Sequence, residues 1–388
     1  MAFALFCVLA FTASAGAASS IFGTTGSSPV GIMIDSVGNI YTANSGSDTV
    51  TKITPDGISA TLGTTGRYPQ RVAVDSVGNI YTANQGSDNV SKITPGGLST
   101  TLGTTGHGPA GIAIDSSNNV YTANGESDTV TKITPQGISS TLGNTGKTPY
   151  EIAIDSTGNI YTSNWESDNV SKITPAGVST ILGTTGSYPQ GIAIDSASNV
   201  YTTNNTSGSV SKITPAGVST ILGTTGSYPA GIAIDSSNNV YTANFGSNNV
   251  SKITPAGVST ILGTTGSYPQ GIAIDSASNV YTANWKSGGV SKITSDAKQA
   301  VKWLAVTKTK TVTALITPAK GVTYMLTASQ GQKIKKGSCK NVTIKQGSKK
   351  LARRSCTIKL TKGKWLLSIT PKQGSVTGAS SSKTYNFK

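Results

Sequence analysis

The sequence predicts an all-β protein whose main part is a seven-bladed β-propeller. A unit of 40 residues recurs seven times, because an aspartate returns at this interval from Asp35 to Asp275 and a tyrosine from Tyr41 to Tyr281. Each unit holds four short apolar runs, and four strands in about 40 residues is the pattern of one propeller blade. Only 12% of the residues are charged while 45 are glycine, which also favours strands and turns.

The four strands of a unit can be assigned in its sixth copy. We expect strands at residues 231–235, 239–244, 250–254 and 258–262. The segment DSSNN at 235–239 supplies the residue types of a tight hairpin between the first two strands. Pro255 ends the third strand, and Gly257 turns the chain into the fourth.

The number of strands indicates a closed ring. The last third-strand motif, VSKIT, ends at Thr294 without a fourth strand after it. The missing strand is found at the other end, because residues 17–26 (AASSIFGTTG) match residues 57–66 (GISATLGTTG). We therefore expect residues 19–23 to pair with 290–294. Such pairing removes an open sheet edge that would otherwise invite aggregation.

Residues 1–17 have the pattern of a signal peptide, an apolar run that ends in Ala15, Gly16 and Ala17. We expect a secreted or cell-surface protein with no transmembrane span after cleavage, because no later segment reaches the roughly 20 apolar residues of a span. The run lacks Lys and Arg, so an uncleaved anchor is the alternative. Cleavage removes Cys7 and leaves Cys339 and Cys356, for which export predicts one disulfide.

The repeat carries a resemblance to known propellers over residues 18–294. The pattern PxGIAIDSxGNVYTANxxSxxVSKITPxGxST resembles the NHL repeat, and its KITPxG segment is similar to the streptogramin lyase (virginiamycin B lyase) family. NHL propellers mostly bind proteins, peptides, glycans or RNA, whereas the lyases use a histidine and acidic residues around a metal. This chain has one histidine, His107, which cannot supply a multi-histidine site or catalytic triad by itself. We therefore expect no metal, no cofactor and no catalytic residues.

The seven copies differ mainly in two loops, one after the second strand and one leading into the inner strand. A propeller places both on one face around its central channel, where rigid scaffolds often carry binding sites. The repeated Asp and Tyr are expected to be structural, and loops that packing does not constrain also drift without any ligand. Aromatic rings can cover the apolar surfaces of a ligand, and carboxylates can accept its hydrogen bonds. This combination suits sugars or peptides. The candidate ligand-binding residues are Trp165, Trp285, Phe245, Arg71, Glu151, Tyr150, Glu126, Glu166 and Tyr68, with Asp88, Asp128 and Asp168 nearby.

The C-terminal part differs sharply in charge from the repeats. Residues 295–388 hold 20 Lys and Arg and one acid, Asp296, for a net charge of +19, whereas residues 18–294 carry −4. Short segments that alternate polar with apolar residues predict six or seven strands in a small β-sandwich. The closing stretch from Gly363 resembles the last strands of immunoglobulin-like or fibronectin III-like modules.

A basic module of this kind is expected to bind polyanions, with an affinity that falls as salt rises. Outside the cell these would be anionic envelope polymers. The absence of an RNA-recognition signature argues against sequence-specific nucleic-acid binding. The candidate polyanion-binding residues are Lys335, Lys336, Lys349, Lys350, Arg353 and Arg354.

Together these features predict an exported, non-catalytic binding or scaffold protein with three segments, 1–17, 18–294 and 295–388. Its propeller face would bind a protein, peptide or glycan, and its basic module would associate with the envelope. One alternative is a lyase-like, metal-dependent enzyme that uses Glu151, Glu126 and Glu166. A second alternative is a structural component of a surface layer or matrix.

Overall fold

The computed structural model describes residues 19–294 in full and, beyond them, the backbone of nine strands between residues 302 and 387. Contacts group Ser19–Ser295 into one compact unit and Asp296–Lys388 into another. The predicted signal peptide lies outside the described residues. In the described parts of the chain, no helix has the length and apolar character that crossing a bilayer requires.

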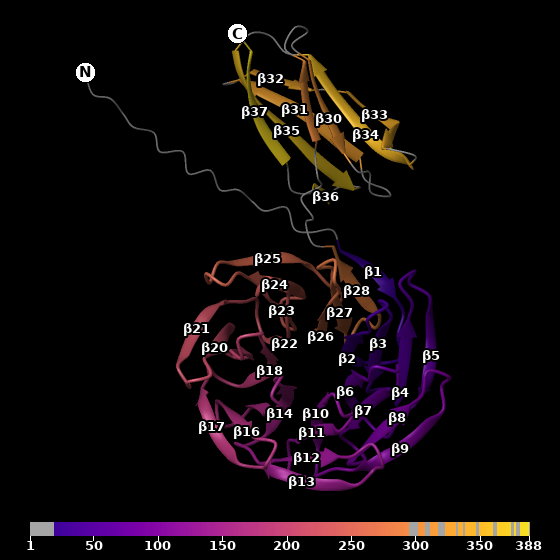
Figure 1. Cartoon of the computed structure of the whole chain (residues 1–388), viewed down its shortest axis with the longest axis vertical. Coiled ribbons are helices and arrows are strands. Elements are labelled where there is room, and N and C mark those ends of the chain that lie inside the picture. Colours follow the sequence, from indigo (N-terminus) through magenta and orange to yellow (C-terminus); the bar gives the residue numbers. More distant parts are fainter. Residues whose placement is uncertain are drawn as a thin grey trace, which may run out of the picture. The chain divides into compact units, whose positions relative to one another are not determined.

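Seven four-stranded antiparallel sheets stand side by side in a ring, as the repeat predicts (Figure 1). We number the blades 1 to 7, starting from β2. The inner strands, which line the central channel, are β2 (Pro29–Ile34), β6 (Pro69–Val74), β10 (Pro109–Ile114), β14 (Pro149–Ile154), β18 (Pro189–Ile194), β22 (Pro229–Ile234) and β26 (Pro269–Ile274). The second strands are β3 (Ile40–Asn44), β7 (Ile80–Asn84), β11 (Val120–Asn124), β15 (Ile160–Asn164), β19 (Val200–Asn204), β23 (Val240–Asn244) and β27 (Val280–Asn284).

The remaining two strands of each blade complete the sheet toward the rim. The third strands are β4 (Thr49–Ile53), β8 (Asn89–Ile93), β12 (Thr129–Ile133), β16 (Asn169–Ile173), β20 (Ser209–Ile213), β24 (Asn249–Ile253) and β28 (Val290–Ile293). The outer strands are β5 (Ser59–Thr64), β9 (Ser99–Thr104), β13 (Ser139–Asn144), β17 (Ser179–Thr184), β21 (Ser219–Thr224), β25 (Ser259–Thr264) and β1 (Ser19–Gly23).

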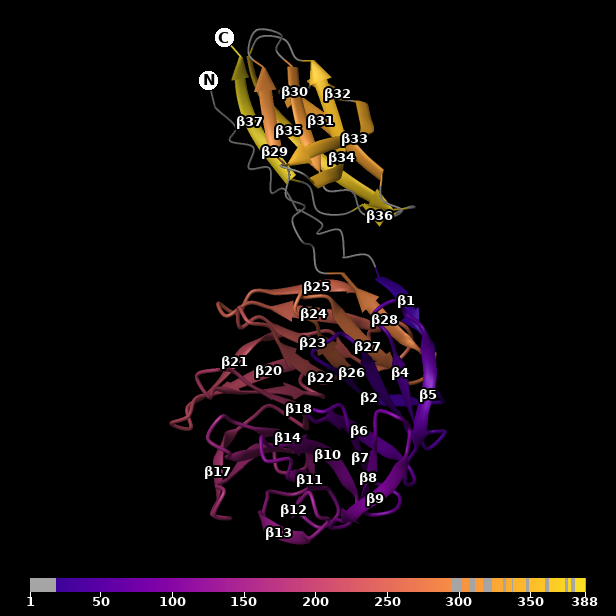
Figure 2. The ribbon, with the colours of Figure 1, turned by 45° about the vertical axis from the view of Figure 1, so that its right-hand side comes forward.

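The N-terminal strand closes the ring, as predicted. Strand β1 pairs antiparallel with β28, with Ser19 opposite Ile293, and the two strands lie together in both views (Figure 2). The ring of Phe22 meets that of Tyr281 edge to face with centroids 5.3 Å apart. The backbone N–H of Gly289 donates to Thr25 Oγ1 at 2.9 Å. Blade 7 is therefore built from both ends of the repeat region.

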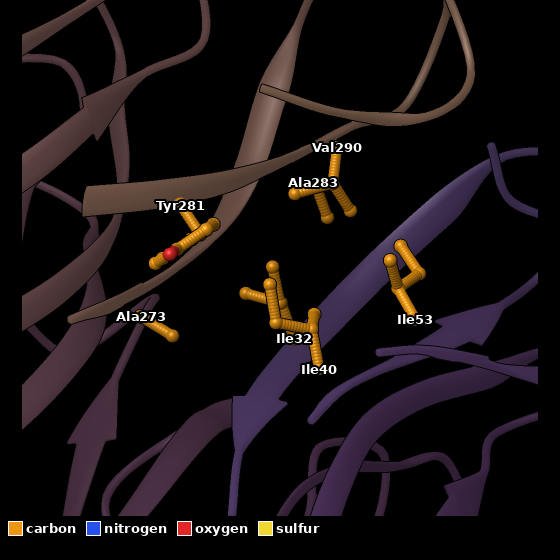
Figure 3. Packing of buried hydrophobic residues seen from close by; sticks show 7 residues of the cluster. All are labelled: Ile32, Ile40, Ile53, Ala273, Tyr281, Ala283 and Val290. Atoms are coloured by element: carbon orange, nitrogen blue, oxygen red, sulfur yellow. The ribbon is translucent and has the colours of Figure 1, made fainter. Parts of the chain in front are cut away.

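Apolar side chains fill the wedge between neighbouring blades. Between blades 7 and 1, side chains from both sheets point toward one another (Figure 3). The buried members of this cluster are Ile32, Ile40, Ile53, Ala273, Tyr281, Ala283 and Val290. Clusters with equivalent residues lie at other blade junctions. Burial of one such Val or Ile side chain contributes about 1.5–3 kcal/mol, so this repeated wedge is the main source of stability.

In five blades the inner strand approaches its neighbour so closely that the third residue of the strand is glycine. A Cβ atom on Gly231 would lie 2.5 Å from the carbonyl oxygen of Gln270, and one on Gly111 would lie 2.9 Å from Cα of Glu151. Neither contact is sterically possible without moving the backbone. The glycine of the GIAID motif is therefore a packing requirement at these junctions, whereas blades 2 and 4 carry Arg71 and Glu151 at the same position.

Each blade also contains the same hydrogen-bonded aspartate turn. In blade 4, Asp155 accepts the backbone N–H groups of Thr157 and Asn159, the Asn159 amide and the Tyr161 hydroxyl. Burial opposes ionisation of Asp155, but the hydrogen bonds from Asn159, Thr157 and Tyr161 outweigh it and lower its pKa to about 2. Burial and the nearby carboxylate of Asp35 raise the pKa of Tyr41 to about 12. The repeated Asp and Tyr thus form structural contacts, as expected.

The C-terminal strands form two antiparallel sheets. One sheet has the order β29-β30-β34-β33, and in the other β32, β31, β35 and β36 are neighbours while β37 also pairs with β35. Their bounds are β29 (Lys302–Val306), β30 (Thr311–Ile316), β31 (Thr323–Gln330), β32 (Lys333–Lys336), β33 (Ser338–Gln346), β34 (Lys349–Lys359), β35 (Gly363–Gln373), β36 (Val376–Thr377) and β37 (Ser381–Phe387). The register of β33 and β34 places Cys339 directly opposite Cys356, a backbone placement compatible with the disulfide that stays a prediction.

Deleting residues 18–26 is expected to lower the melting temperature by about 5–10 °C, because the loss of β1 exposes one edge of the β28 strand and removes Phe22 from the core. Differential scanning calorimetry of the full chain measures the shift. Ile21→Thr is the control, since blade 1 has Thr61 at the equivalent exposed position. An unchanged melting temperature in the deletion variant would refute closure by β1.

Stability is expected to fall as the pH drops from about 4 toward 2. The pKa values of Asp155 and of Asp35, Asp75, Asp115, Asp195 and Asp235 are lowered in the fold, since hydrogen bonds outweigh burial. A lowered folded-state pKa stabilises the protein above the unfolded value of about 3.9, and this stabilisation is lost as pH falls through the folded value.

The urea midpoint measured from pH 6 to pH 2 tests this dependence. Asp155→Asn should cost about 1–3 kcal/mol at neutral pH, because its amide nitrogen would face two donors, and should make the acid loss shallower. Asp56→Asn, which changes an exposed carboxylate, is the control. Identical pH curves for Asp155→Asn and the unmodified chain would contradict the role of the turn.

Candidate ligand-binding site

The two variable loops of each blade are hydrogen-bonded to one another. The backbone N–H of Ser27, in the connection into blade 1, donates to Ser47 Oγ in the loop after β3 at 3.2 Å. Asp48 Oδ1 in that loop accepts the N–H of Tyr68 in the next connection at 2.8 Å. Equivalent bonds recur around the ring. Both loops therefore lie on one face, as expected, and we call these segments, 24–28 and 45–48 with their 40-residue equivalents, the loop face.

Four tyrosines of the loop face adopt a backbone conformation that aromatic residues rarely take. The φ angles of Tyr68, Tyr188, Tyr228 and Tyr268 lie between 52° and 57°. Tyr188 is held there because its N–H donates to Asp168 Oδ1 at 2.7 Å and its carbonyl accepts from the N–H of Asn205 at 3.0 Å.

The aspartates of the loop face accept hydrogen bonds from the backbone and so hold it in this conformation. Asp88, Asp128 and Asp168 each accept the N–H of the residue with positive φ in the following connection. These carboxylates were expected near the ligand, and the structure shows them bonded to the protein's own backbone.

The predicted aromatic residues gather in two clusters. The ring of Trp165 lies between those of Tyr150 and Tyr188, at centroid distances of 5.7 and 5.2 Å. In the second cluster Phe245 stacks on Tyr268 at 4.6 Å with an interplanar angle of 19°. Trp285 completes that cluster, 6.4 Å from Phe245. The loop aromatic of one blade thus stands against the tyrosine of the next.

A pocket of about 330 Å³ lies between the two clusters, and we call it the mouth pocket. Its lining residues come from blades 4 to 7 and are Trp165, Gln190, Asn205, Tyr228, Ala230, Phe245 and Gln270. The volume is at the small end of the range for small-molecule sites, about 300–1,000 Å³.

The hollow arises from one small side chain. The second residue of each inner strand lies at the channel end of the loop face, and in blades 5 and 7 it is Gln190 and Gln270. Blade 6 has Ala230 at this position, buried between these two blades. A methyl group where both neighbours carry an amide side chain leaves room for a ligand.

The lining of the mouth pocket combines aromatic rings with three side-chain amides and carries no charge. Asn205 Nδ2 donates to Gln190 Oε1 at 3.0 Å and to the carbonyl of Pro229 at 3.3 Å. Gln270 Oε1 is buried without a hydrogen-bond partner. Four of the other unpartnered buried side-chain atoms in the described chain are serine hydroxyls at equivalent outer-strand positions, Ser99, Ser139, Ser219 and Ser259. These serines occupy the same position in four blades and so reflect the repeated structure, whereas Gln270 lines the mouth pocket.

A second pocket of about 490 Å³ lies where β1 closes the ring. It is lined mainly by glycine, serine and threonine, including Gly288 and Gly289 of the last loop. No ring and no charged side chain lines it, so it offers fewer means of recognising a ligand than the mouth pocket.

Arg71 and Glu151, both predicted as ligand contacts, are partners of each other. Arg71 Nε donates to Glu151 Oε1 at 2.9 Å, and the two side chains are 8% and 21% exposed. The pair passes blade 3, whose Gly111 has no side chain to block it. The guanidinium also lies 5.7 Å from the ring centroid of Tyr150. The buried Arg71 Nη2 has no hydrogen-bond partner in the described chain.

The acidic residues and the histidine do not form a metal site. His107 is 76% exposed, and its Nδ1 lies 2.8 Å from Asp88 Oδ2. This hydrogen bond raises the pKa of His107, and the charges of Asp88 and Glu126 add to the effect. Within the described residues, no three His, Cys, Asp or Glu side chains come close enough together to hold a metal ion. The described residues therefore do not fit the metal site that the resemblance implies.

The other predicted residues lie apart from the mouth pocket. Glu126 and Glu166 belong to the loops of blades 3 and 4, where their N–H groups donate to the carbonyls of His107 and Lys147. Tyr68 is on the same face in blade 2. Among the candidate polyanion-binding residues, Lys335 and Lys336 lie on β32, and Lys349, Lys350, Arg353 and Arg354 lie on β34.

Two of the sequence-predicted residues line the mouth pocket, and its amide-bearing residues were not among the predictions. Trp165 and Phe245 were predicted, and Tyr150 and Trp285 support them from the side. Gln190, Asn205, Ala230 and Gln270 were missed as site residues. The signal was present in the sequence as an alanine in blade 6 between glutamines in blades 5 and 7.

Comparison with solved structures finds propellers of similar shape. A streptogramin B lyase is 16% identical with a TM-score of 0.64, covering 72% of this chain and 98% of that chain. Virginiamycin B lyase from Staphylococcus aureus is 16% identical with a TM-score of 0.62, covering 69% and 95%. A catalytically inactive form of that enzyme with quinupristin is 17% identical with a TM-score of 0.61, covering 70% and 95%. At these identities the likeness shows the fold.

No curated protein sequence matches the chain. The sequence model of the virginiamycin B lyase family matches two overlapping stretches, residues 11–183 and 139–307. These stretches span all seven blades and more than half of the chain. Of the two propeller families that the repeat resembles, the comparisons thus support the second. The chain belongs to the virginiamycin B lyase family.

Proposed function

We propose that this protein is an exported, non-catalytic binding protein whose propeller holds a small ligand, or a small part of a larger one, in the mouth pocket. The ligand would be a protein, peptide or glycan group. The basic C-terminal module would associate with anionic polymers of the cell envelope and keep the propeller near that surface.

The mouth pocket is the observation that carries this proposal. Trp165 and Phe245 form apolar walls, and Gln190, Asn205 and Gln270 bring amide groups to the same space. Small-molecule sites commonly combine such walls with a few fixed polar groups. The ring of Tyr228, from the connection into blade 6, adds a third aromatic side chain to the lining.

Family membership favours a second candidate, a lyase-like enzyme. This candidate requires acidic ligands for a metal, and Glu151 already accepts a hydrogen bond from Arg71. Glu126 and Glu166 do not line the mouth pocket. The structure thus offers rings and amides where a ligand fits, and the binding role has the stronger support.

Tyr228→Ala is expected to weaken binding at least about fivefold, because removing a central aromatic contact commonly costs more than about 1 kcal/mol. Isothermal titration calorimetry of the full chain against soluble glycan and peptide panels measures the affinity. Tyr68→Ala is the matched control, because Tyr68 has the same loop, the same φ and 50% exposure against 54% for Tyr228, but does not line the pocket. Equal affinities for the two variants would place the ligand elsewhere.

Replacing Lys335, Lys336, Lys349, Lys350, Arg353 and Arg354 with glutamine is expected to weaken binding of the full chain to dextran sulfate and to flatten its salt dependence. Affinity is measured by biolayer interferometry at low and high NaCl. The control variant removes six other charges of the same part of the chain, at Lys298, Lys302, Lys308, Lys310, Lys320 and Lys388. Equal losses in both variants would show a general effect of charge and no dedicated site.

A further inference from the structure

We infer that the mouth pocket takes a neutral sugar, one or two units of an uncharged glycan. This inference rests on the proposed binding function and names the chemical class of its ligand. It follows from the charge, the rings, the amides and the volume of the pocket.

The lining excludes a ligand whose recognition depends on charge. All seven lining residues are neutral, and the buried arginine of this face, Arg71, is already paired with Glu151. A carboxylate, a phosphate or an ammonium group would lose hydration without gaining a counter-charge, which is costly in a partly buried site. The terminal groups and charged side chains of peptides are disfavoured for the same reason.

Two large rings from different blades, Trp165 of blade 4 and Phe245 of blade 6, line the same space. Trp165 is held by ring contacts with Tyr150 and Tyr188, and Phe245 is stacked on Tyr268 at 4.6 Å. Side chains fixed in this way lose little conformational entropy when a ligand arrives. The electron-rich face of an aromatic ring suits the C–H surface of a pyranose ring.

The amides match hydroxyl groups. A side-chain amide both donates and accepts hydrogen bonds, and so does a hydroxyl group. Gln270 Oε1 is a buried acceptor without a donor, a state that is unfavourable until a donor is supplied. A sugar hydroxyl seated between Trp165 and Phe245 would supply it. The neighbouring Gln190 amide is already oriented by the hydrogen bond from Asn205.

The repeat itself provides variants that fold. Ala230→Gln introduces the residue that blades 5 and 7 carry at this position and fills the hollow, while Ala110→Gln makes the same change in blade 3, outside the pocket. Gln270→Leu removes the unpartnered acceptor with little change in volume, and Gln70→Leu is its control in blade 2.

The test is calorimetric titration of the full chain and these four variants. The neutral probes are glucose, galactose, mannose, N-acetylglucosamine, cellobiose and lactose. The comparison probes are glucuronic acid, glucosamine and short peptides with blocked ends. We expect a neutral sugar to bind, and its affinity to fall at least tenfold in Ala230→Gln and Gln270→Leu but less than twofold in both controls. Gln270→Leu should keep or raise the melting temperature, because the side-chain carbonyl of Gln270 bonds to nothing in the described protein.

The outcomes separate this inference from the proposed function. If a charged sugar or a peptide binds in a way that Ala230→Gln abolishes, and no neutral sugar does, the sugar assignment is wrong and the binding function stands. If no probe of any class loses affinity in Ala230→Gln, or none binds at all, both are overturned. A fall in melting temperature of Gln270→Leu would give this residue a structural role and contradict its assignment to the ligand.

Discussion

The close approach of neighbouring inner strands is the constraint on which the rest of this structure depends. At Gly231 and Gly111 there is no room for a single extra carbon, so at the five junctions with this glycine the distance between blades is set by close backbone approach. Seven sheets held at one spacing must close on themselves, and the N-terminal strand completes the last of them. Apolar wedges then fill the space between sheets, and the aspartate turns fix their ends. Nearly every position inside the ring is committed to this packing.

Because packing constrains the interior residues, the blades differ in residue type mainly on the loop face. The loops there are not loose, since each is bonded to the connection into its own blade and to that of the next blade. The backbone is held by Asp88, Asp128 and Asp168, which leaves the side chains at the loop tips free to differ. The result is a fixed frame in which one alanine, Ala230, opens a pocket between two fixed aromatic clusters. Blades 2 and 4 also differ from the others at their inner strands, where Arg71 and Glu151 form a hydrogen bond that links them.

The fold was largely predictable because the seven copies of the repeat can be compared with one another within one sequence. Strand positions, hairpins and the closing strand all follow from the 40-residue period, and the observed strands differ from the expected ones by one or two residues at their ends. The site was harder to predict. Rings at 165 and 245 stand out in the sequence, but the pairing of Arg71 with Glu151 and the hollow at Ala230 depend on which blades are neighbours around the ring and on how far each side chain reaches. A carboxylate in a loop also looks the same in sequence whether it meets a ligand or, as for Asp168, a backbone N–H.

Membership of the virginiamycin B lyase family therefore accounts for the architecture, while the residues at the mouth account for the binding role proposed here. The most direct measurement is a crystal structure of the full chain soaked with a neutral disaccharide. The account predicts a sugar ring between Trp165 and Phe245, with one hydroxyl donating to Gln270 Oε1. A ligand bound elsewhere on the ring, or a mouth pocket closed by the protein's own side chains with Gln270 bonded to one of them, would contradict it.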